Sequence, residues 1–105
     1  MDIKNMILEK LDEEAGESVH QIWCSMASPS LPKGSQFLGA VVVDARGPVS
    51  ATLQLNDHGL NLGGEIIYVP IPDGKRVPDE WMYRVMNKDE AINCPFERTR
   101  TTRSG

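Results

Sequence analysis

Two cysteines and two histidines are the side chains of this chain best suited to bind a metal or to form a nucleophile–base pair: Cys24, Cys94, His20 and His58. Zinc sites are usually built from close pairs such as Cys-x-x-Cys, and the chain has no such pair. His20 and Cys24 are four residues apart on one face of a predicted strand, which separates them by ~13 Å. This distance is too long for direct proton transfer. We therefore expect no metal, no cofactor and no Cys–His catalytic pair.

The serines and carboxylates do not occur in a recognisable catalytic pattern either. The segment Gly47-Pro48-Val49-Ser50 is not the Gly-x-Ser-x-Gly elbow of a serine hydrolase. Carboxylates are paired only on predicted helix faces and in turns, where solvation is their ordinary role. Since no nucleophile, base and orienting group occur in one pattern, we expect a protein that is not an enzyme.

The cysteines also indicate the redox state. A small secreted scaffold stabilised by disulfides carries a denser set of cysteines than the two present here. We expect both thiols to be reduced, with Cys24 buried in a strand and Cys94 near the end of the fold.

The glycine-rich segment over residues 58–65 (HGLNLGGE) is the most distinctive candidate for a binding loop. Glycines allow backbone amides to turn toward an anion, as in phosphate-binding loops. Those loops lie between a strand and the start of a helix, whereas this segment follows a predicted helix. A helix C-terminal cap with Gly59 and Gly63 in left-handed conformations explains it without a ligand. The alternative is a ligand or partner contact made by Asn61, Gly63, Gly64 and Glu65.

Aromatic and acidic side chains are the other candidates for a binding surface. Trp23 and Trp81 are either exposed contacts beside acidic residues or members of a small core, and the sequence does not decide between the two. Glu13, Glu14 and Glu17 crowd the end of the first predicted helix. They either solvate a loop that follows Leu11 or form an acidic surface for a basic partner.

Hydrophobic periodicity predicts the elements that would position these residues. The strand over residues 37–45 is continuously apolar, which favours a central strand covered on both faces, with Gly39 at a bulge or a close backbone approach. Pro70 places the third strand at an edge. In the second helix, Val49, Leu53 and Leu60 are expected to lie on one side, with Ala51 and Leu55 adjoining. The predicted elements are a helix over 2–15, a strand over 19–27, the strand over 37–45, a helix from 48 to about 58, a strand over 66–71 and a helix from 77 to about 87, with one more turn over 89–92.

The order α-β-β-α-β-α predicts a single α+β domain over residues 1–94. Its sheet is expected to be three-stranded and mixed, with residues 37–71 forming a parallel β-α-β crossover. The exposed edges of such a small sheet favour a homodimer formed through an edge strand. Residues 95–105 include three arginines and are expected to form a disordered basic tail.

Composition excludes several classes of function. The chain has 105 residues and a net charge of −4, which argues against nucleic-acid binding because such proteins concentrate basic charge. No apolar run is long enough to cross a membrane. The acidic, amphipathic N-terminal segment is unlike a secretory signal, so the expected location is the cytoplasm.

The run over residues 37–66 resembles a stretch of small uncharacterised bacterial and phage-encoded proteins. The resemblance is carried by the Phe37-Leu38-Gly39 start of a strand, a following helix and a Gly-x-Asn-x-Gly-Gly-Glu turn over residues 59–65. It implies a bacterial or phage cytoplasm and an accessory role, with no particular activity attached.

Together these patterns predict a small non-enzymatic accessory module that binds another protein through surface contacts. The alternative is a small-ligand binder, for example of a nucleotide, with its pocket at the Gly63-Gly64 turn or between subunits. The two hypotheses differ in whether a glycine turn or an aromatic surface makes the contact.

Overall fold

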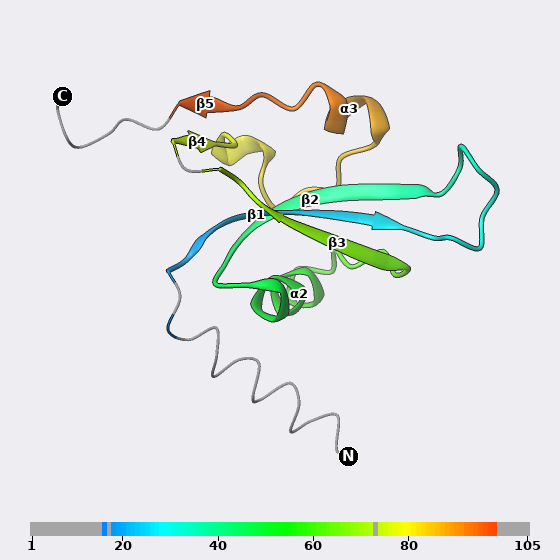
Figure 1. Ribbon diagram of the computed structural model, residues 1–105, viewed down its shortest axis with the longest axis horizontal. Coiled ribbons are helices and arrows are strands. Elements are labelled where there is room, and N and C mark those ends of the chain that lie inside the picture. The colour runs from blue at the N-terminus through cyan, green and yellow to red at the C-terminus, as the bar shows by residue number, and fades with distance from the viewer. Residues whose placement is uncertain (1–15, 17, 73, 99–105) are drawn as a thin grey trace, which may run out of the picture.

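The computed structural model describes residues 16, 18–72 and 74–98. Its main sheet contains three strands, β1 (His20–Ala27), β2 (Phe37–Ala45) and β3 (Glu65–Pro70), in the order β2-β1-β3. Both pairings are antiparallel, and β1 lies at the centre (Figure 1).

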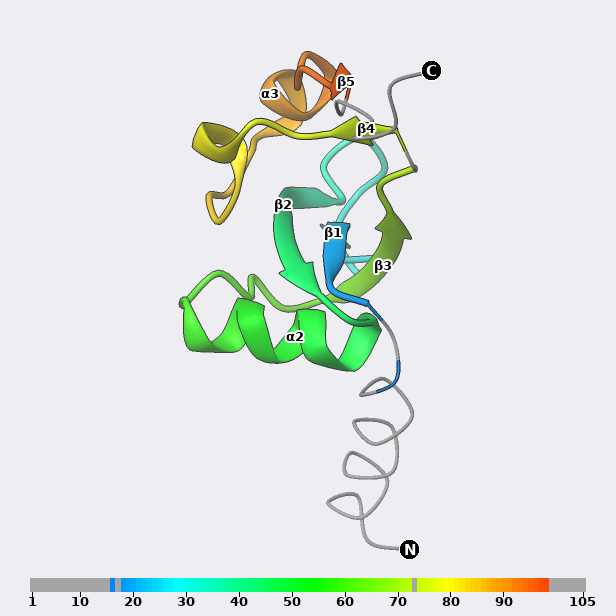
Figure 2. The ribbon, with the colours of Figure 1, turned by 90° about the vertical axis from the view of Figure 1, so that its left-hand side faces the viewer.

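Two further layers cover the faces of this sheet (Figure 2). One face packs against α2 (Pro48–Asp57). The other packs against the C-terminal part of the chain, which contains β4 (Lys75–Arg76), the 3-10 turn η1 (Asp79–Trp81), α3 (Lys88–Ile92) and β5 (Glu97–Arg98). The strands β4 and β5 form a second, two-stranded antiparallel sheet. The predicted α+β class is therefore confirmed.

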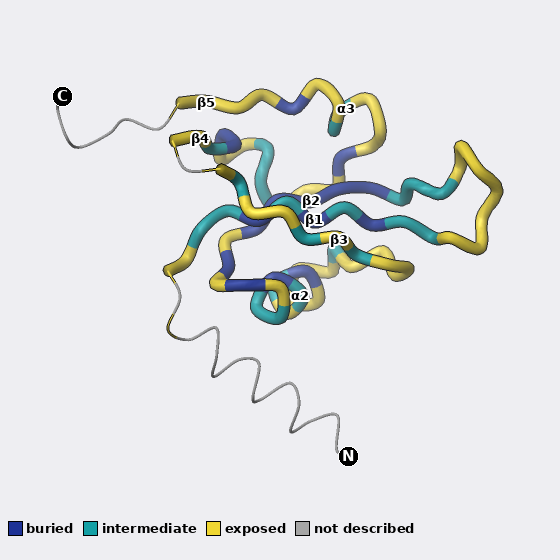
Figure 3. The backbone as a smooth tube through the Cα atoms, in the orientation of Figure 1, coloured by how far each residue is buried: buried dark blue, intermediate teal, exposed yellow. Residues whose placement is uncertain are grey.

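The core is divided by the sheet into two clusters. On the α2 side, alternate residues of β1 (Ile22, Cys24 and Met26) pack with Val41, Val43 and the buried helix residues Ala51 and Leu55. On the other side, Ala40 and Val42 of β2 pack with residues of the C-terminal layer, namely Val77, Met86 and Cys94. Since successive residues of β2 point to opposite faces, residues 40–43 are all fully buried (Figure 3).

The strand order corrects two predictions. Strand β2 is covered on both faces as expected, but it is not the central strand, because β1 pairs with both β2 and β3. The sheet is antiparallel throughout rather than mixed. The connection from β2 through α2 to β3 does join two strands of the same direction, but it crosses over β1, so these two strands never pair.

The outer edge of β2 explains why no helix covers residues 77–87. The backbone of Met86 exchanges two hydrogen bonds with Ala40, with N–O distances of 3.1 and 2.8 Å, and the N–H of Tyr83 donates to the carbonyl of Val42 at 2.9 Å. Tyr83 has φ of +54°, which a helix does not permit. The predicted helix is therefore wrong: only η1 is helical there, and Tyr83 and Met86 bond to the edge of β2.

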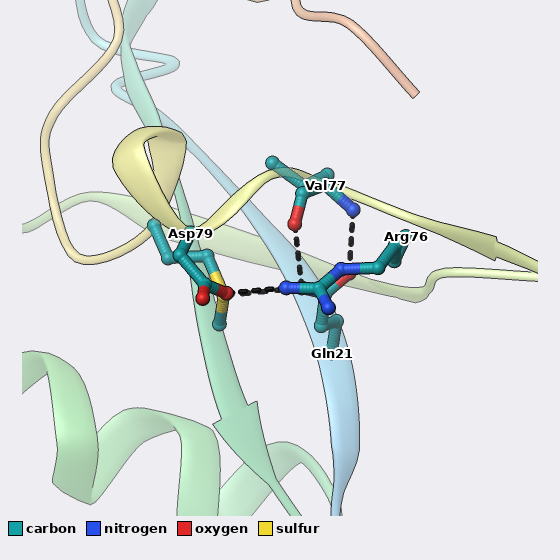
Figure 4. A network of polar contacts seen from close by, with 5 residues as sticks. Gln21, Arg76, Val77 and Asp79 are labelled. Atoms are coloured by element: carbon teal, nitrogen blue, oxygen red, sulfur yellow. Dashed lines mark hydrogen bonds and ion pairs between the residues drawn. The ribbon is translucent and has the colours of Figure 1, made fainter. Parts of the chain in front are cut away.

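A glutamine holds the C-terminal layer to the central strand (Figure 4). The side-chain Oε1 of Gln21 accepts from the backbone N–H of Val77 at 2.6 Å, and its Nε2 donates to the carbonyl of Val77 at 2.8 Å. The same Nε2 lies 3.0 Å from the sulfur of Met82. Because Val77 is fully buried, this side chain satisfies two backbone groups that water cannot reach.

Other boundaries agree with the predictions or shift slightly. The predicted helix from Pro48 is confirmed; the adjoining residues Ala51 and Leu55 are its buried ones, and Leu53 is exposed. Gly39 occurs at a register shift and approaches Met86 closely, as expected. Strand β3 is an edge strand, as Pro70 predicts. The described fold continues beyond residue 94 into β5, while the predicted helix over 2–15 and residues 99–105 lie outside the described residues.

Candidate functional site

The glycine-rich turn between α2 and β3 is held by its own side chains. Gly59 and Gly63 have φ of +66° and +86°, which confirms the left-handed conformations expected at these positions. Asn61 Oδ1 accepts from the N–H of Gly63 at 2.9 Å, and Asn61 Nδ2 donates to the side chain of Asn56 at 2.8 Å. The Gly63 N–H is therefore bonded within the turn and is not free to bind an anion.

Gly64 is required for a close approach of two backbone segments. Its φ is +71°, and a Cβ atom at this position would lie 2.2 Å from the carbonyl oxygen of Ala27 at the end of β1. Glu65 follows as the first, exposed residue of β3. Packing thus accounts for Gly64, and a ligand or partner contact by Asn61, Gly63, Gly64 and Glu65 stays a prediction.

A different set of residues forms an apolar groove between the end of β3 and the C-terminal layer. The groove has a volume of about 370 Å³. Two of its lining residues, Trp23 and Phe96, stack with ring centroids 6.1 Å apart. The side chains that line it are all apolar: Trp23, Val69, Pro70, Ile71, Pro72, Ala91 and Phe96.

The groove is open because the C-terminal layer covers only part of the sheet. Ala40 and Val42 of β2 are fully buried on this face, whereas Val69 of β3 is 49% exposed and Phe96 is 47% exposed. Val69 is the direct partner of Trp23 across β1 and β3. Figure 3 shows the change from buried β2 to mostly exposed β3 across the sheet. Large apolar side chains left uncovered in this way are typical of protein contact surfaces.

Two basic residues follow closely in sequence after two residues that line the groove. The segment after Pro72 leads into β4 and the segment after Phe96 leads into β5, where the exposed side chains of Lys75 and Arg98 are directly opposite each other. Like charges opposite each other destabilise a strand pair. Arg76 is neutralised by an ion pair with Asp79, but Lys75 and Arg98 have no ion-pair partner within residues 18–72 and 74–98.

The two tryptophans have different surroundings. Trp23 is half-buried and lines the groove, which makes it both a member of the second core cluster and part of an open surface. Trp81 is also half-buried, but it packs beneath the guanidinium of Arg84, which lies 4.9 Å from the ring centroid and forms an ion pair with Glu90. Trp81 is not among the residues that line the groove. Glu13, Glu14 and Glu17 lie outside the described residues.

The candidate metal ligands are not brought together. Within the described ranges, no three His, Cys, Asp or Glu side chains are placed to hold a metal ion. Cys24 and Cys94 are both free thiols, and Cys24 is buried in a strand, as expected; Cys94 is buried as well. Burial raises the pKa of the Cys24 thiol to about 11 from an ordinary value of 9.0. Such a thiol remains protonated at neutral pH and is a poor nucleophile.

This pKa shift predicts how stability changes in alkali. Between about pH 9 and pH 11 the unfolded chain loses the Cys24 proton while the folded protein keeps it, so the free energy of unfolding decreases as pH rises, by at most ~1.4 kcal/mol per pH unit. Urea unfolding at about pH 8 and about pH 10 measures the decrease. The variant Cys24→Ala has no thiol at this position and should show a smaller decrease. Equal decreases in the two proteins would contradict the prediction.

Most residues that line the groove were not predicted from the sequence. Trp23 was a candidate, but Val69 and Phe96 were not. Alternation in β3, which leaves Ile67 and Val69 on the face opposite Tyr68, was a usable signal for an uncovered apolar surface. Phe96 carried no such signal, because it lies in the segment that was expected to be a disordered tail.

Compared with protein-family models, curated proteins and solved structures, the chain shows no significant match to any of the three. Among the described residues, no helix is long and apolar enough to cross a membrane.

Proposed function

We propose that this protein is a non-enzymatic binding module that holds a large apolar side chain of a partner protein in the groove beside Trp23. The observation that carries the proposal is the half-exposed Val69–Trp23–Phe96 surface, which folding leaves uncovered. Buried aromatic residues in a pocket are the usual energetic centres of protein interfaces.

The lining of the groove favours a protein segment over a nucleotide. All seven lining side chains are apolar, so the groove offers no charged side chain to a phosphate. The volume of about 370 Å³ is at the small end of the range for ligand pockets. A single anchoring side chain, such as an aromatic or a long aliphatic residue, matches both properties.

The charges nearby favour an acidic residue close to this anchor. Lys75 and Arg98 are exposed and face each other across β4 and β5, and a carboxylate placed between them would relieve their repulsion. We therefore propose a partner segment in which an apolar anchor is followed or preceded by Asp or Glu. Complementary charges of this kind mainly increase the rate of association.

Selection from a random peptide library displayed on phage tests the proposal. The expected consensus is one large apolar residue close to Asp or Glu. Phe96→Ala should weaken binding of a selected peptide about tenfold or more. Ile92→Ala is the matched control, because Ile92 is 70% exposed and does not line the groove. Peptides that bind the Phe96→Ala variant as tightly as the unmodified protein would overturn the proposal.

A separate measurement tests the alternative that the protein binds a small ligand. Native mass spectrometry of protein purified gently from its expression host weighs any retained compound together with the chain. A constant excess of mass that Phe96→Ala removes would replace the partner segment by a small apolar ligand. An excess removed by a substitution at Gly63 would favour the glycine turn instead.

A further inference from the structure

The outer edge of β3 has free backbone groups. The N–H of Ile71 donates to the carbonyl of Gln21 at 3.0 Å, which fixes the alternation of the β1–β3 pair. Residues 65, 67 and 69 therefore direct their backbone groups toward β1, and Ile66, Tyr68 and Pro70 direct theirs outward. Ile66 and Tyr68 each offer an N–H and a C=O, while Pro70 offers only a C=O. In the described part of the chain no strand pairs with this edge.

The opposite edge of the same sheet is already occupied. There, Ala40 exchanges hydrogen bonds with Met86, and Val42 accepts from Tyr83. The N–H of Asp44 donates to the hydroxyl of Tyr83 at 3.1 Å. Tyr83 and Met86 thus occupy the hydrogen-bonding edge of β2. Within the described residues, no segment occupies the outer edge of β3 in this way.

The composition of β3 leaves its middle residues unprotected from pairing. Natural edge strands are commonly protected by charged side chains, especially lysine, by proline or by a bulge. The strand reads Glu-Ile-Ile-Tyr-Val-Pro, with its one charge at the first position and its one proline at the last, so residues 66–69 between them contain neither. On one face of the sheet, Ile67 is 64% exposed and Val69 is 49% exposed. Its partner should therefore be another apolar strand with few charges.

We propose that this partner is β3 of a second copy of the chain, paired antiparallel about a two-fold axis that passes beside Ile67. In this register Ile66 lies opposite Tyr68 of the second copy, and the same pair repeats on the other side of the axis. Each pair exchanges two hydrogen bonds, so every outward N–H and C=O of Ile66 and Tyr68 finds a partner.

Neighbouring registers satisfy fewer groups. An axis beside Tyr68 sets Ile66 opposite Pro70, which has no N–H to donate to the Ile66 carbonyl. An axis beside Ile66 sets Tyr68 opposite Gly64, which lies outside the strand and has φ of +71°. Pro70 at one end and Gly64 at the other thus select the register centred on Ile67.

The side chains of this register are also self-complementary. Ile67 contacts its counterpart across the axis on one face of the sheet, and Ile66 contacts Tyr68 of the second copy on the other face. Aromatic and β-branched cross-strand pairs of this kind are favourable. The result is a continuous six-stranded sheet. This proposal does not depend on the proposed function, since Ile67 does not line the groove.

Cysteine cross-linking tests the register directly. In the proposed dimer the two Ile67 positions form a non-hydrogen-bonded pair with Cα atoms ~4.5 Å apart, within the range for a disulfide. Ile67→Cys should therefore form a covalent dimer under mild oxidation. Val69→Cys is the matched control: it is exposed on the same face, but the two copies of this position are ~13 Å apart along the strands. Cys24 and Cys94 are 0% and 7% exposed, so they should not contribute.

Sedimentation across a concentration series tests the dimer without a disulfide. The unmodified chain should reach a dimer, Ile67→Lys should remain a monomer with unchanged circular dichroism, and Leu53→Lys on the exposed side of α2 should still dimerise. Phe96→Ala should also dimerise, which separates this proposal from peptide binding in the groove. A monomer at every concentration, or equal cross-linking of Ile67→Cys and Val69→Cys, would overturn the inference.

Discussion

Gly64→Ala should destabilise the fold by about 3–5 kcal/mol. The new Cβ would lie 2.2 Å from the carbonyl oxygen of Ala27, a contact that only backbone movement can relieve. The residue would also have to hold φ of +71°, which costs an L-residue ~1–2 kcal/mol by itself. Since β3 begins at the next residue, the movement would disturb its pairing with β1.

Gly63→Ala separates the two contributions. Gly63 has φ of +86°, but a Cβ there would meet no atom within 4 Å, so only the conformational cost of ~1–2 kcal/mol is expected. Urea unfolding followed by circular dichroism measures both variants. If Gly64→Ala is no less stable than Gly63→Ala, then the close approach to Ala27 does not limit the fold.

The second large effect is expected for Gln21→Leu, at about 3 kcal/mol. This substitution keeps the size of the side chain but removes both hydrogen bonds to Val77, whose N–H and C=O would remain buried without partners. A buried polar group left unpaired costs ~1–3 kcal/mol. The loss should also loosen the C-terminal layer, which Gln21 connects to the central strand (Figure 4).

Gln36→Leu is the control for this prediction. The amide of Gln36 donates to the carbonyls of Pro29 and Leu31 at 3.3 and 3.0 Å in an exposed loop, where water can replace it, so a cost below ~1 kcal/mol is expected. Hydrogen exchange gives a second readout: the Val77 amide should exchange faster in Gln21→Leu while amides of β1 facing β2 change less. Similar losses of stability in the two variants would contradict the role assigned to Gln21.

Hydrophobic periodicity and turn-forming residues predicted the individual strands of the main sheet and the start of α2. The strands expected over residues 19–27 and 37–45 are present, Cys24 and the apolar run over 40–43 are buried as expected, and Pro48 marked the start of α2. Residues 77–87 have helical spacing, with Trp81 and Val85 four apart. Here long-range hydrogen bonds to β2 outweighed that spacing, and no property of the segment alone reveals them.

The strand order and the candidate groove could not be predicted from the sequence either, because both depend on contacts between segments that are distant in the chain. Which strand lies at the centre depends on which edges are occupied, and the occupant of the β2 edge was itself expected to be helical. The groove combines Trp23, Val69 and Phe96 from three distant segments. By contrast, the left-handed conformations of Gly59 and Gly63 depend on local backbone geometry and were predicted residue by residue.

The central place of β1 also has a consequence for how the chain folds. β1 and β2 are joined by a loop over residues 28–36 and can pair soon after both have been synthesised, whereas β3 must wait for α2 and then close a much longer segment onto β1. Closing longer loops costs more entropy, and contacts distant in sequence form more slowly. The β1–β2 hairpin is therefore expected to form early, and docking of β3 to be a late event. Until β3 docks, the backbone edge of β1 that later pairs with β3 remains open to other chains.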